Sequence, residues 1–435
     1  MTAMGCAAKA LDASLECCGM RGACVVGALI FLAVSAANGA FAAERAVQYI
    51  LVNRMPGNPW DQNRPESITK DGFLEVKQAL PQAPGSTVKV GIGFIFSYLN
   101  STSDEVLLAS LKRFLALAEE TDTPVFVQLD GDNWWGARPD LWNWWDPSRP
   151  GYNAANRMNV EWTGWSPDNA IKIAWRNWGR QIRVLPPPNL MSPRYRGACR
   201  QKLRLLVPVV VRWWRRLPAD KRYLLAGVKV GHESSIGVNA WYYPHGNDLL
   251  DRPTEQDPTA GVDVDQVPSR GVAQIGYAAV STAGIRMSGA ITDADLAEVV
   301  RRHLVEQSRA AAQCGLPREK LFTHCGGWKS DELLYDAALN RYSCPGWSFY
   351  RHADDPRKDA GVVKALARSN APTWGAVEWL YQGPREVGPW RRALADTLSY
   401  RGCRLVCIYN WEGIRDSPAV LEAIRQVVAQ SVVRR

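Results

Sequence analysis

The segment Leu225-Ala-Gly-Val-Lys-Val-Gly-His-Glu233 joins a nearly continuous apolar run, Leu225 to Gly231, to two ionisable side chains. A strand of a parallel sheet has this composition, because helices cover both of its faces. Seven further runs of this kind occur along the chain, and segments with helical periodicity separate them. These runs are Val47 to Asn53, Val88 to Tyr98, Pro124 to Asp130, Leu321 to His324, Trp347 to Tyr350, Gly375 to Glu378 and Leu405 to Tyr409.

Eight strand and helix units predict a closed parallel barrel, an α/β fold of the (β/α)8 type. The pairs Thr102 with Glu105 and Thr292 with Asp295 have the spacing of helix capping boxes. A chain of 435 residues fits one decorated barrel, and no Gly/Ser-rich or Pro-rich tether divides it. Two connections are unusually long, residues 132–196 after the third run and 234–290 after the fourth. Because both leave the carboxyl ends of strands, we expect them to form substrate-binding walls.

The N-terminal segment has the features of a secretory signal peptide. Arg21 precedes an apolar run from Ala23 to Ala36, and Ala40-Phe41-Ala42 matches an A-x-A cleavage pattern. We expect residues 1–42 to be removed, translation to start at Met20, and residues 43–435 to form the barrel. The mature protein is then secreted or periplasmic. A membrane anchor is the alternative, although the apolar run is shorter than the ~20 residues of a spanning helix.

Composition narrows the class of protein. Hydrophobic residues at 46% and charged residues at 22% exclude a disordered chain or a coiled coil. The formal net charge of +9 is compatible with an anionic glycan as substrate. The basic cluster Arg212, Arg215 and Arg216 is typical of a solvated helix face, and no nucleic-acid motif accompanies it, so we expect no nucleic-acid partner.

Six cysteines remain after removal of the expected signal peptide, namely Cys199, Cys314, Cys325, Cys344, Cys403 and Cys407. An even number in an exported protein permits disulfides, and we expect Cys325 to pair with Cys344 because both border one loop. Cys403 and Cys407 lie in one predicted strand and are expected to pack in the core.

Two glutamates close strands of the predicted barrel. Glu233 follows the fourth run, and Glu378 ends the seventh. Strand ends converge on one pocket in a barrel, so these carboxyl groups are expected to face each other. A pair of carboxyl groups can split a glycosidic bond, one as proton donor and the other as nucleophile or base. The alternative for each glutamate is a salt bridge at a strand end.

This pattern resembles the retaining TIM-barrel glycosidases of clan A. The resemblance implies that Glu233 is the acid/base and Glu378 the nucleophile, that Tyr350 contacts the nucleophile and that Trp411 lies under the sugar. Apolar walls would raise the pKa of Glu233, and Tyr350 would hold that of Glu378 low. One residue departs from the clan, because His232 precedes the acid/base where the clan has Asn. The contact to the sugar 2-hydroxyl is therefore in doubt.

The chain contains 19 Trp beside only 9 Phe, and flat aromatic rings suit the apolar faces of sugars. We expect sugar contacts from aromatic residues of the loops and strand ends: Trp134, Trp135, Trp241, Tyr242, Trp328, Tyr350, Trp379 and Trp411. Polar contacts are expected from Asp130, Asp132, His232, Asn239 and His324. About half of the aromatic rings would instead pack the long loops, and the polar groups would instead satisfy loop amides.

The chain is therefore expected to be an exported glycoside hydrolase that cleaves a β-linked oligosaccharide or polysaccharide and requires no cofactor. Its histidines lack the HxH and HExxH spacings, and Asp130 and Asp132 with His324 are the only conceivable metal ligands, so no metal is expected. Two alternatives keep the same barrel. One is an inverting glycosidase, and the other is an exported carbohydrate-binding protein without catalysis.

Overall fold

The computed structural model describes residues 47–57, 59–178, 180–236, 240–263, 271–326 and 333–432. The expected signal peptide, residues 1–42, and the expected start at Met20 lie outside these residues. All elements described below belong to one compact unit, Val47–Arg435. Among the described residues, no helix has both the length and the apolar character needed to cross a bilayer.

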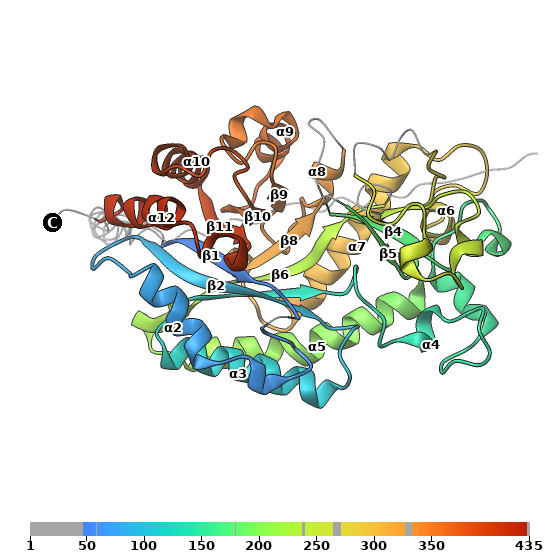
Figure 1. The fold of residues 1–435 in the computed structure, drawn as a ribbon, viewed down its shortest axis with the longest axis horizontal. Helices are drawn as coiled ribbons and strands as arrows, with labels where there is room; N and C mark the ends of the chain where they lie inside the picture. Colours follow the sequence, from blue (N-terminus) through green and yellow to red (C-terminus); the bar gives the residue numbers. More distant parts are fainter. Residues whose placement is uncertain are drawn as a thin grey trace, which may run out of the picture. The chain divides into compact units, whose positions relative to one another are not determined.

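Eight parallel strands close into a barrel (Figure 1). Around the barrel their order is β1, β11, β10, β9, β8, β6, β3 and β2. They are β1 (Gln48–Arg54), β2 (Val88–Ser97), β3 (Val125–Asp130), β6 (Leu225–Ser234), β8 (Leu321–Cys325), β9 (Gly346–Phe349), β10 (Trp374–Trp379) and β11 (Cys403–Tyr409). Each strand coincides with one of the apolar runs, so the predicted (β/α)8 fold is confirmed.

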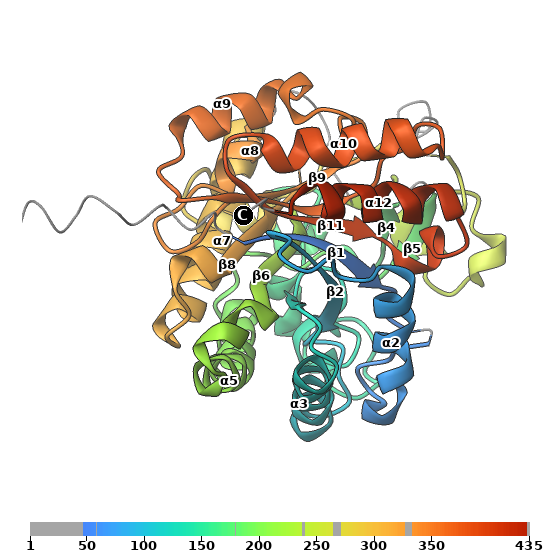
Figure 2. The same cartoon turned by 90° about the vertical axis from the view of Figure 1, so that its left-hand side faces the viewer.

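Helices surround the barrel, as Figure 2 shows. They are α2 (Lys70–Ala79), α3 (Asp104–Glu120), α5 (Pro193–Arg216), α7 (Asp293–Gln313), α8 (Leu334–Ala337), α9 (Ala360–Arg368), α10 (Val387–Ser399) and α12 (Pro418–Gln430). The capping box predicted for Thr292 and Asp295 is present at the start of α7. At α3 the prediction is off by one residue, because the hydroxyl of Ser103, and not that of Thr102, accepts from the backbone N–H of Val106.

The barrel interior changes from apolar to polar along the strands. Near the amino ends it contains a buried apolar cluster that includes Tyr49, Leu51, Phe126, Phe322 and Leu405. Further along, the interior carries buried polar groups, and Gln128 donates to Oδ1 of Asn53 at 2.5 Å. Alternate residues of a strand share a face, so the later inward positions continue the same rows with polar side chains. The polar end is the carboxyl end, where the two glutamates lie.

The two long insertions pair with each other. Strands β4 (Ala174–Asn177) and β5 (Gln181–Val184) of the first insertion join β7 (Ala240–Trp241) of the second in an antiparallel sheet of order β5, β4, β7. The short helices α4 (Pro139–Trp142) and α6 (Tyr277–Thr282) belong to the same insertions. Figure 1 shows β4, β5 and α6 together at the right, beyond the strand ends. The insertions therefore form one small subdomain over the barrel mouth.

The predicted disulfide between Cys325 and Cys344 is absent, and none of the six described cysteines forms a disulfide. Register explains the difference, because Cys325 lies opposite Trp347 whereas Cys344 lies opposite Phe322. Three residues of offset along neighbouring strands correspond to about 10 Å, which exceeds the reach of a disulfide. The two thiols instead contact the backbone carbonyls of Leu334 at 2.9 Å and Arg318 at 3.4 Å.

Candidate active site

An irregular strand end positions Glu233. The register of β6 against β8 shifts between Val230 and Ser234, and both Gly231 (φ +77°) and Glu233 (φ +50°) have left-handed backbone conformations. A Cβ atom on Gly231 would also stand 2.7 Å from Cδ2 of Leu304, so this position requires glycine. Bulges re-aim side chains, and a non-glycine residue in a strained conformation is typical of functional sites. Here the irregularity brings the carboxyl group of Glu233 to β9.

The carboxyl group of Glu233 is buried and bonded at both oxygens. Its Oε1 accepts from the hydroxyl of Ser348 at 2.8 Å, and its Oε2 accepts from the indole N–H of Trp178 at 3.2 Å. Burial, followed by the charge of Glu378, raises the pKa of Glu233 to about 8. A carboxyl group with this pKa is protonated at neutral pH and can serve as a proton donor.

Glu378 occupies a second bulge, because the pairing of β10 with β9 shifts between Ala376 and Glu378. The hydroxyl of Tyr350 donates to its Oε1, as the resemblance implies. Among the described residues its Oε2 has no hydrogen-bond partner, and Nε2 of His232 lies 3.8 Å away. Burial raises the pKa of Glu378, opposed by the charge of Lys229 and by the Tyr350 hydrogen bond. The prediction of a low pKa for Glu378 is therefore wrong, since burial outweighs the hydrogen bond.

A buried lysine links two histidines beneath the glutamates. Nζ of Lys229 lies 2.9 Å from Nδ1 of His232 and 3.0 Å from Nδ1 of His324. Burial lowers the pKa of Lys229 and of both histidines. When the amino group donates to both Nδ1 atoms, each neutral imidazole carries its proton on Nε2. His324 then presents that proton to Oγ of Ser348, 2.8 Å away.

The two histidines and Glu378 also form a cluster in which one ligand atom from each lies within 4.8 Å of the others, which is the spacing of a metal site. Sequence spacing could not reveal this cluster, because His232 and His324 belong to different strands. However, the amino group of Lys229 already contacts both Nδ1 atoms. A cation bound among these groups would lie close to a lysine, which disfavours a metal.

Five residues of the site were not predicted: Lys229, Ser348, Tyr409, Arg176 and Trp178. The first three line the barrel, and burial with the charges of Glu378 and Glu233 raises the pKa of Tyr409. Tyr409 was detectable, because it ends the eighth predicted strand. Arg176 and Trp178 come from the first insertion, and their position depends on the pairing of β4 with β7.

Several predicted residues lie together with the glutamates. His232, His324 and Tyr350 make the contacts described above, and the ring of Trp134, which is 37% exposed, lies 5.5 Å from that of Trp178. Asp130 is buried nearby, and burial with the charge of Asp132 raises its pKa to about 6. Two predicted residues, Asn239 and Trp328, lie outside the described residues.

Four predicted aromatic residues are buried among protein groups and present no open ring face. Trp135 donates to the carbonyl of Pro186, and the backbone N–H of Asn247 donates to the hydroxyl of Tyr242. Trp379 packs against Trp390 of α10, and Trp411 donates to Oε1 of Glu75 on α2. The last barrel strand, β11, ends at Tyr409, and Trp411 begins the short helix α11 (Trp411–Ile414). Sequence does not tell which way a ring points, so a sugar contact at these four positions stays a prediction.

The remaining predicted residues, Asp132 and Trp241, differ in their surroundings. Asp132 is buried and accepts hydrogen bonds from Tyr195, Ser234 and His303. Its oxygens are thus bonded to protein donors, and a sugar contact of Asp132 stays a prediction. Trp241 is only partly buried and lies opposite Trp175 in the small sheet.

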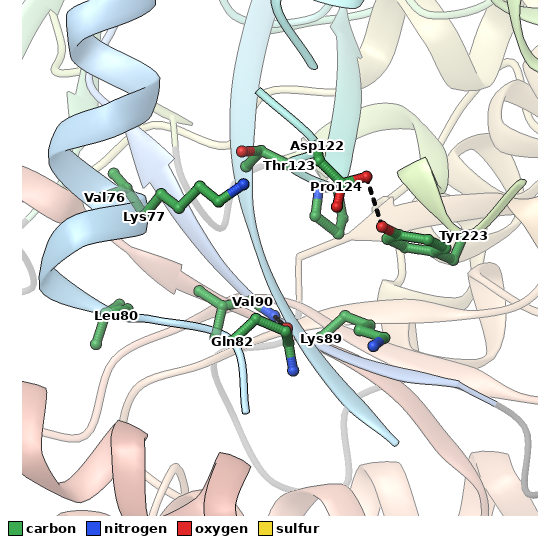
Figure 3. A pocket seen from close by; sticks show the side chains of 10 residues that line it. All are labelled: Val76, Lys77, Leu80, Gln82, Lys89, Val90, Asp122, Thr123, Pro124 and Tyr223. Carbon is green, nitrogen blue, oxygen red and sulfur yellow. Dashed lines mark hydrogen bonds between the residues drawn. The ribbon is translucent and has the colours of Figure 1, made fainter. Parts of the chain in front are cut away.

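A separate hollow lies at the amino end of the barrel strands, between α2 and β2 (Figure 3). Its lining includes Lys77, Lys89, Asp122 and Tyr223. Lys77 donates to the carbonyl of Thr121 at 2.5 Å, and Tyr223 donates to Asp122 at 2.6 Å. Lys89 lies over the ring of Tyr223, with Nζ 5.4 Å from its centroid, and neither glutamate borders the hollow. The candidate active site is therefore at the carboxyl end.

Comparison with known proteins finds no protein-family model and no curated protein sequence that matches the chain. Among solved structures, an agarase is 10% identical with a TM-score of 0.36 over 75% of this chain and 48% of its own, so this chain spans about half of the agarase. A GH113 β-1,4-mannanase is 9% identical, with a TM-score of 0.37 over 89% of this chain and 98% of its own. PbGH5A, a glycoside hydrolase family 5 enzyme from Prevotella bryantii B14, is 9% identical, with a TM-score of 0.40 over 88% and 95%. At these identities the likeness is one of fold alone.

Proposed function

We propose that this chain is a glycoside hydrolase that cleaves a β-linked oligosaccharide or polysaccharide. The observation that carries the proposal is a pair of carboxyl groups, Glu233 and Glu378, at the carboxyl end of the barrel: burial raises the pKa of both, and the charge of Glu378 raises that of Glu233 further. Two carboxyl groups in such an arrangement hold one proton between them near neutral pH. This state supplies one acid and one carboxylate, which is the requirement for glycosidic bond cleavage.

The surroundings of the two groups support different roles for Glu233 and Glu378. Glu233 has a pKa of about 8 and retains the proton, so it donates to the leaving oxygen. Glu378 faces the charge of Lys229 and accepts from Tyr350, both of which favour its ionised form. Its unpaired Oε2 is the atom that would attack the anomeric carbon in a retaining mechanism. Glu233 would then act as a base toward water in the second step.

A substrate must displace one existing contact to reach the acid. The indole of Trp178 occupies Oε2 of Glu233, and this half-buried ring lies beside the exposed ring of Trp134. A sugar ring that stacks on these indoles would bring its glycosidic oxygen to the carboxyl group. The two rings therefore support a carbohydrate as the ligand.

The replacement Glu378→Gln tests the proposal, with Glu386→Gln, at an exposed helix start, as the matched control. On a β-linked glycan that the wild type cleaves, we expect kcat to fall on the order of 10³-fold or more for Glu378→Gln and to stay unchanged for the control. Full activity of Glu378→Gln would contradict the assignment. Glycan binding without any turnover by the wild type would instead identify a non-catalytic binding protein.

The stereochemistry of the first product separates the two hydrolytic mechanisms. A retaining enzyme releases the β-anomer from a β-linked substrate, and proton NMR detects this anomer before mutarotation. Release of the α-anomer would establish an inverting mechanism, for which the carboxyl separation is ~6.5–9.5 Å in place of ~5–5.5 Å.

We also propose that the protein is exported and works as a secreted or periplasmic enzyme without a cofactor. The Ala40-Phe41-Ala42 pattern after an apolar run supports export. N-terminal sequencing of the extracellular protein should begin at Ala43, and a mature chain that retains Phe41 would contradict this cleavage site.

A further inference from the structure

The small sheet of the insertions carries an arginine at the barrel mouth. Arg176 lies on β4, opposite Ile182 of β5 and Ala240 of β7. Its neighbour Trp175 points to the other face, where the indole donates to Oδ2 of Asp257. Arg176 lines a hollow together with Asn133 and Glu233. Its side chain is therefore directed toward the candidate acid.

The guanidinium group of Arg176 is buried without a direct partner. The residue is 6% exposed, and among the described residues its side chain has neither a salt bridge nor a hydrogen bond. Its guanidinium lies over the ring of Trp178, whose centroid is 5.7 Å from Cζ. A buried guanidinium normally bonds to a carboxylate, because removal of its charge from water is costly. An unpaired guanidinium next to a reactive group has N–H donors available for a ligand.

The nearby carboxyl groups do not provide this partner. Asp130, Asp132 and Glu233 are close enough to act on Arg176 through their charge. However, Asp130 accepts from the backbone of Asp132 and Asn133, Asp132 accepts from His303, and Glu233 accepts from Trp178 and Ser348. The acidic groups thus compensate the charge of Arg176 from a distance, and the five N–H donors of its guanidinium stay available.

We propose that Arg176 binds an anionic substituent, a carboxylate or a sulfate ester, on a sugar unit held beside Glu233. This inference rests on the proposed function and names the substrate class of the same site. A planar guanidinium matches the two oxygens of a carboxylate or sulfate in a bidentate contact. Ala240 opposite Arg176 leaves space on this face of the sheet, because its side chain is a single methyl group. The net charge of +9 would also favour approach of an anionic polymer.

Binding of matched monosaccharides tests the proposal without turnover. Isothermal titration with glucuronate, glucose 6-sulfate and glucose compares ligands that differ only at C6. We expect the wild type to bind at least one of the anionic sugars about 10- to 100-fold more tightly than glucose, because a hydrogen bond to a charged group contributes this much. A preference for glucuronate indicates a carboxylate ligand, and a preference for glucose 6-sulfate indicates a sulfate ester.

Two variants and a control assign the preference to Arg176. We expect Arg176→Gln to lower the affinity for the anionic sugar to that for glucose, and Arg176→Lys to retain part of the preference because it keeps the charge but not the fork. Arg212→Gln removes the same charge from the exposed face of α5 and should bind like the wild type. The melting temperature of Arg176→Gln should equal or exceed that of the wild type, since it removes an unpaired buried charge.

Two results would overturn the inference: equal affinity of the wild type for all three sugars, or an anionic preference that persists in Arg176→Gln. Failure of the proposed function looks different. A protein that binds an anionic sugar through Arg176 but hydrolyses no glycan would contradict the hydrolase and leave the anion site intact. Turnover of neutral glycans at a rate that Arg176→Gln does not change, with no preference for an anionic sugar, would support the hydrolase and contradict the anion site.

Discussion

The indole of Trp178 donates a hydrogen bond of 3.2 Å to Oε2 of Glu233. The two residues come from different parts of the fold, since Trp178 belongs to the first insertion and Glu233 to a barrel strand. This hydrogen bond lowers the pKa of Glu233, against the larger upward effect of burial. The insertion therefore adjusts the strength of the acid that the barrel provides.

We expect Trp178→Phe to move the alkaline limb of the pH profile of kcat/KM to higher pH, by up to about one unit. Phe keeps a flat ring but loses the N–H donor, so the neutral form of Glu233 persists to higher pH. Steady-state rates from pH 5 to 10 measure the shift. Trp165→Phe is the control, because its indole donates to the carbonyl of Gly289 within the insertions. A shift to lower pH would contradict the role of this hydrogen bond.

The alkaline limb should also depend on Glu233 itself. Its pKa is raised to about 8, so the proton needed by the leaving group is present below this pH and is lost as pH rises through it. Glu233→Gln cannot lose a proton, and we expect its residual rate to stay flat between pH 7 and 9. Glu255→Gln, at an exposed position, should retain the wild-type profile. An unchanged alkaline limb in Glu233→Gln would assign that limb to another group.

The barrel and both glutamates could be predicted from sequence because each depends on local patterns. A strand covered on both faces has a continuous apolar sequence, and Glu233 and Glu378 lie at the ends of such runs. The bulges that aim these side chains were not predictable. They depend on pairing with β8 and β9, which the composition of β6 and β10 alone does not specify.

The contacts between distant segments could not be predicted. Lys229 and His324 are 95 residues apart, and their meeting requires the closed barrel. Arg176 reaches the mouth only because β4 pairs with β7, a strand of two residues without a sequence signal. The error for Cys325 and Cys344 has the same origin, since loop proximity in sequence did not give the register of the strands.

We expect Lys229→Met to disturb the protonation of both histidines that it contacts. Its amino group donates to Nδ1 of His232 and His324, which leaves the ring protons on Nε2. Without this donor the Nδ1–H form becomes accessible, and nitrogen-15 NMR of labelled histidines distinguishes the two tautomers. Lys112→Met, at an exposed site, should leave the spectrum unchanged.

Chelation of the wild-type protein tests the metal-like cluster of His232, His324 and Glu378. If Lys229 serves as the cation among these groups, chelation leaves wild-type activity unchanged and the spectrum of the histidines unperturbed by added zinc. Loss of activity on chelation, with recovery on addition of a divalent metal, would show that His232, His324 and Glu378 bind an ion despite the lysine.

Asp132 should contribute to stability rather than to sugar binding. Burial alone would raise its pKa, but the charge and hydrogen bond of His303, with hydrogen bonds from Ser234 and Tyr195, outweigh burial and hold the pKa below its ordinary value. We expect Asp132→Asn to cost about 1.5–3 kcal/mol of unfolding free energy at pH 7, since it removes the charged acceptor of buried hydrogen bonds from Tyr195, Ser234 and His303. The depressed pKa means that this contribution is complete above pH ~4 and declines as pH falls further. Thermal unfolding at pH 7 and pH 3 should therefore show a smaller difference between variant and wild type at pH 3, whereas Asp416→Asn, 89% exposed, should match the wild type at both.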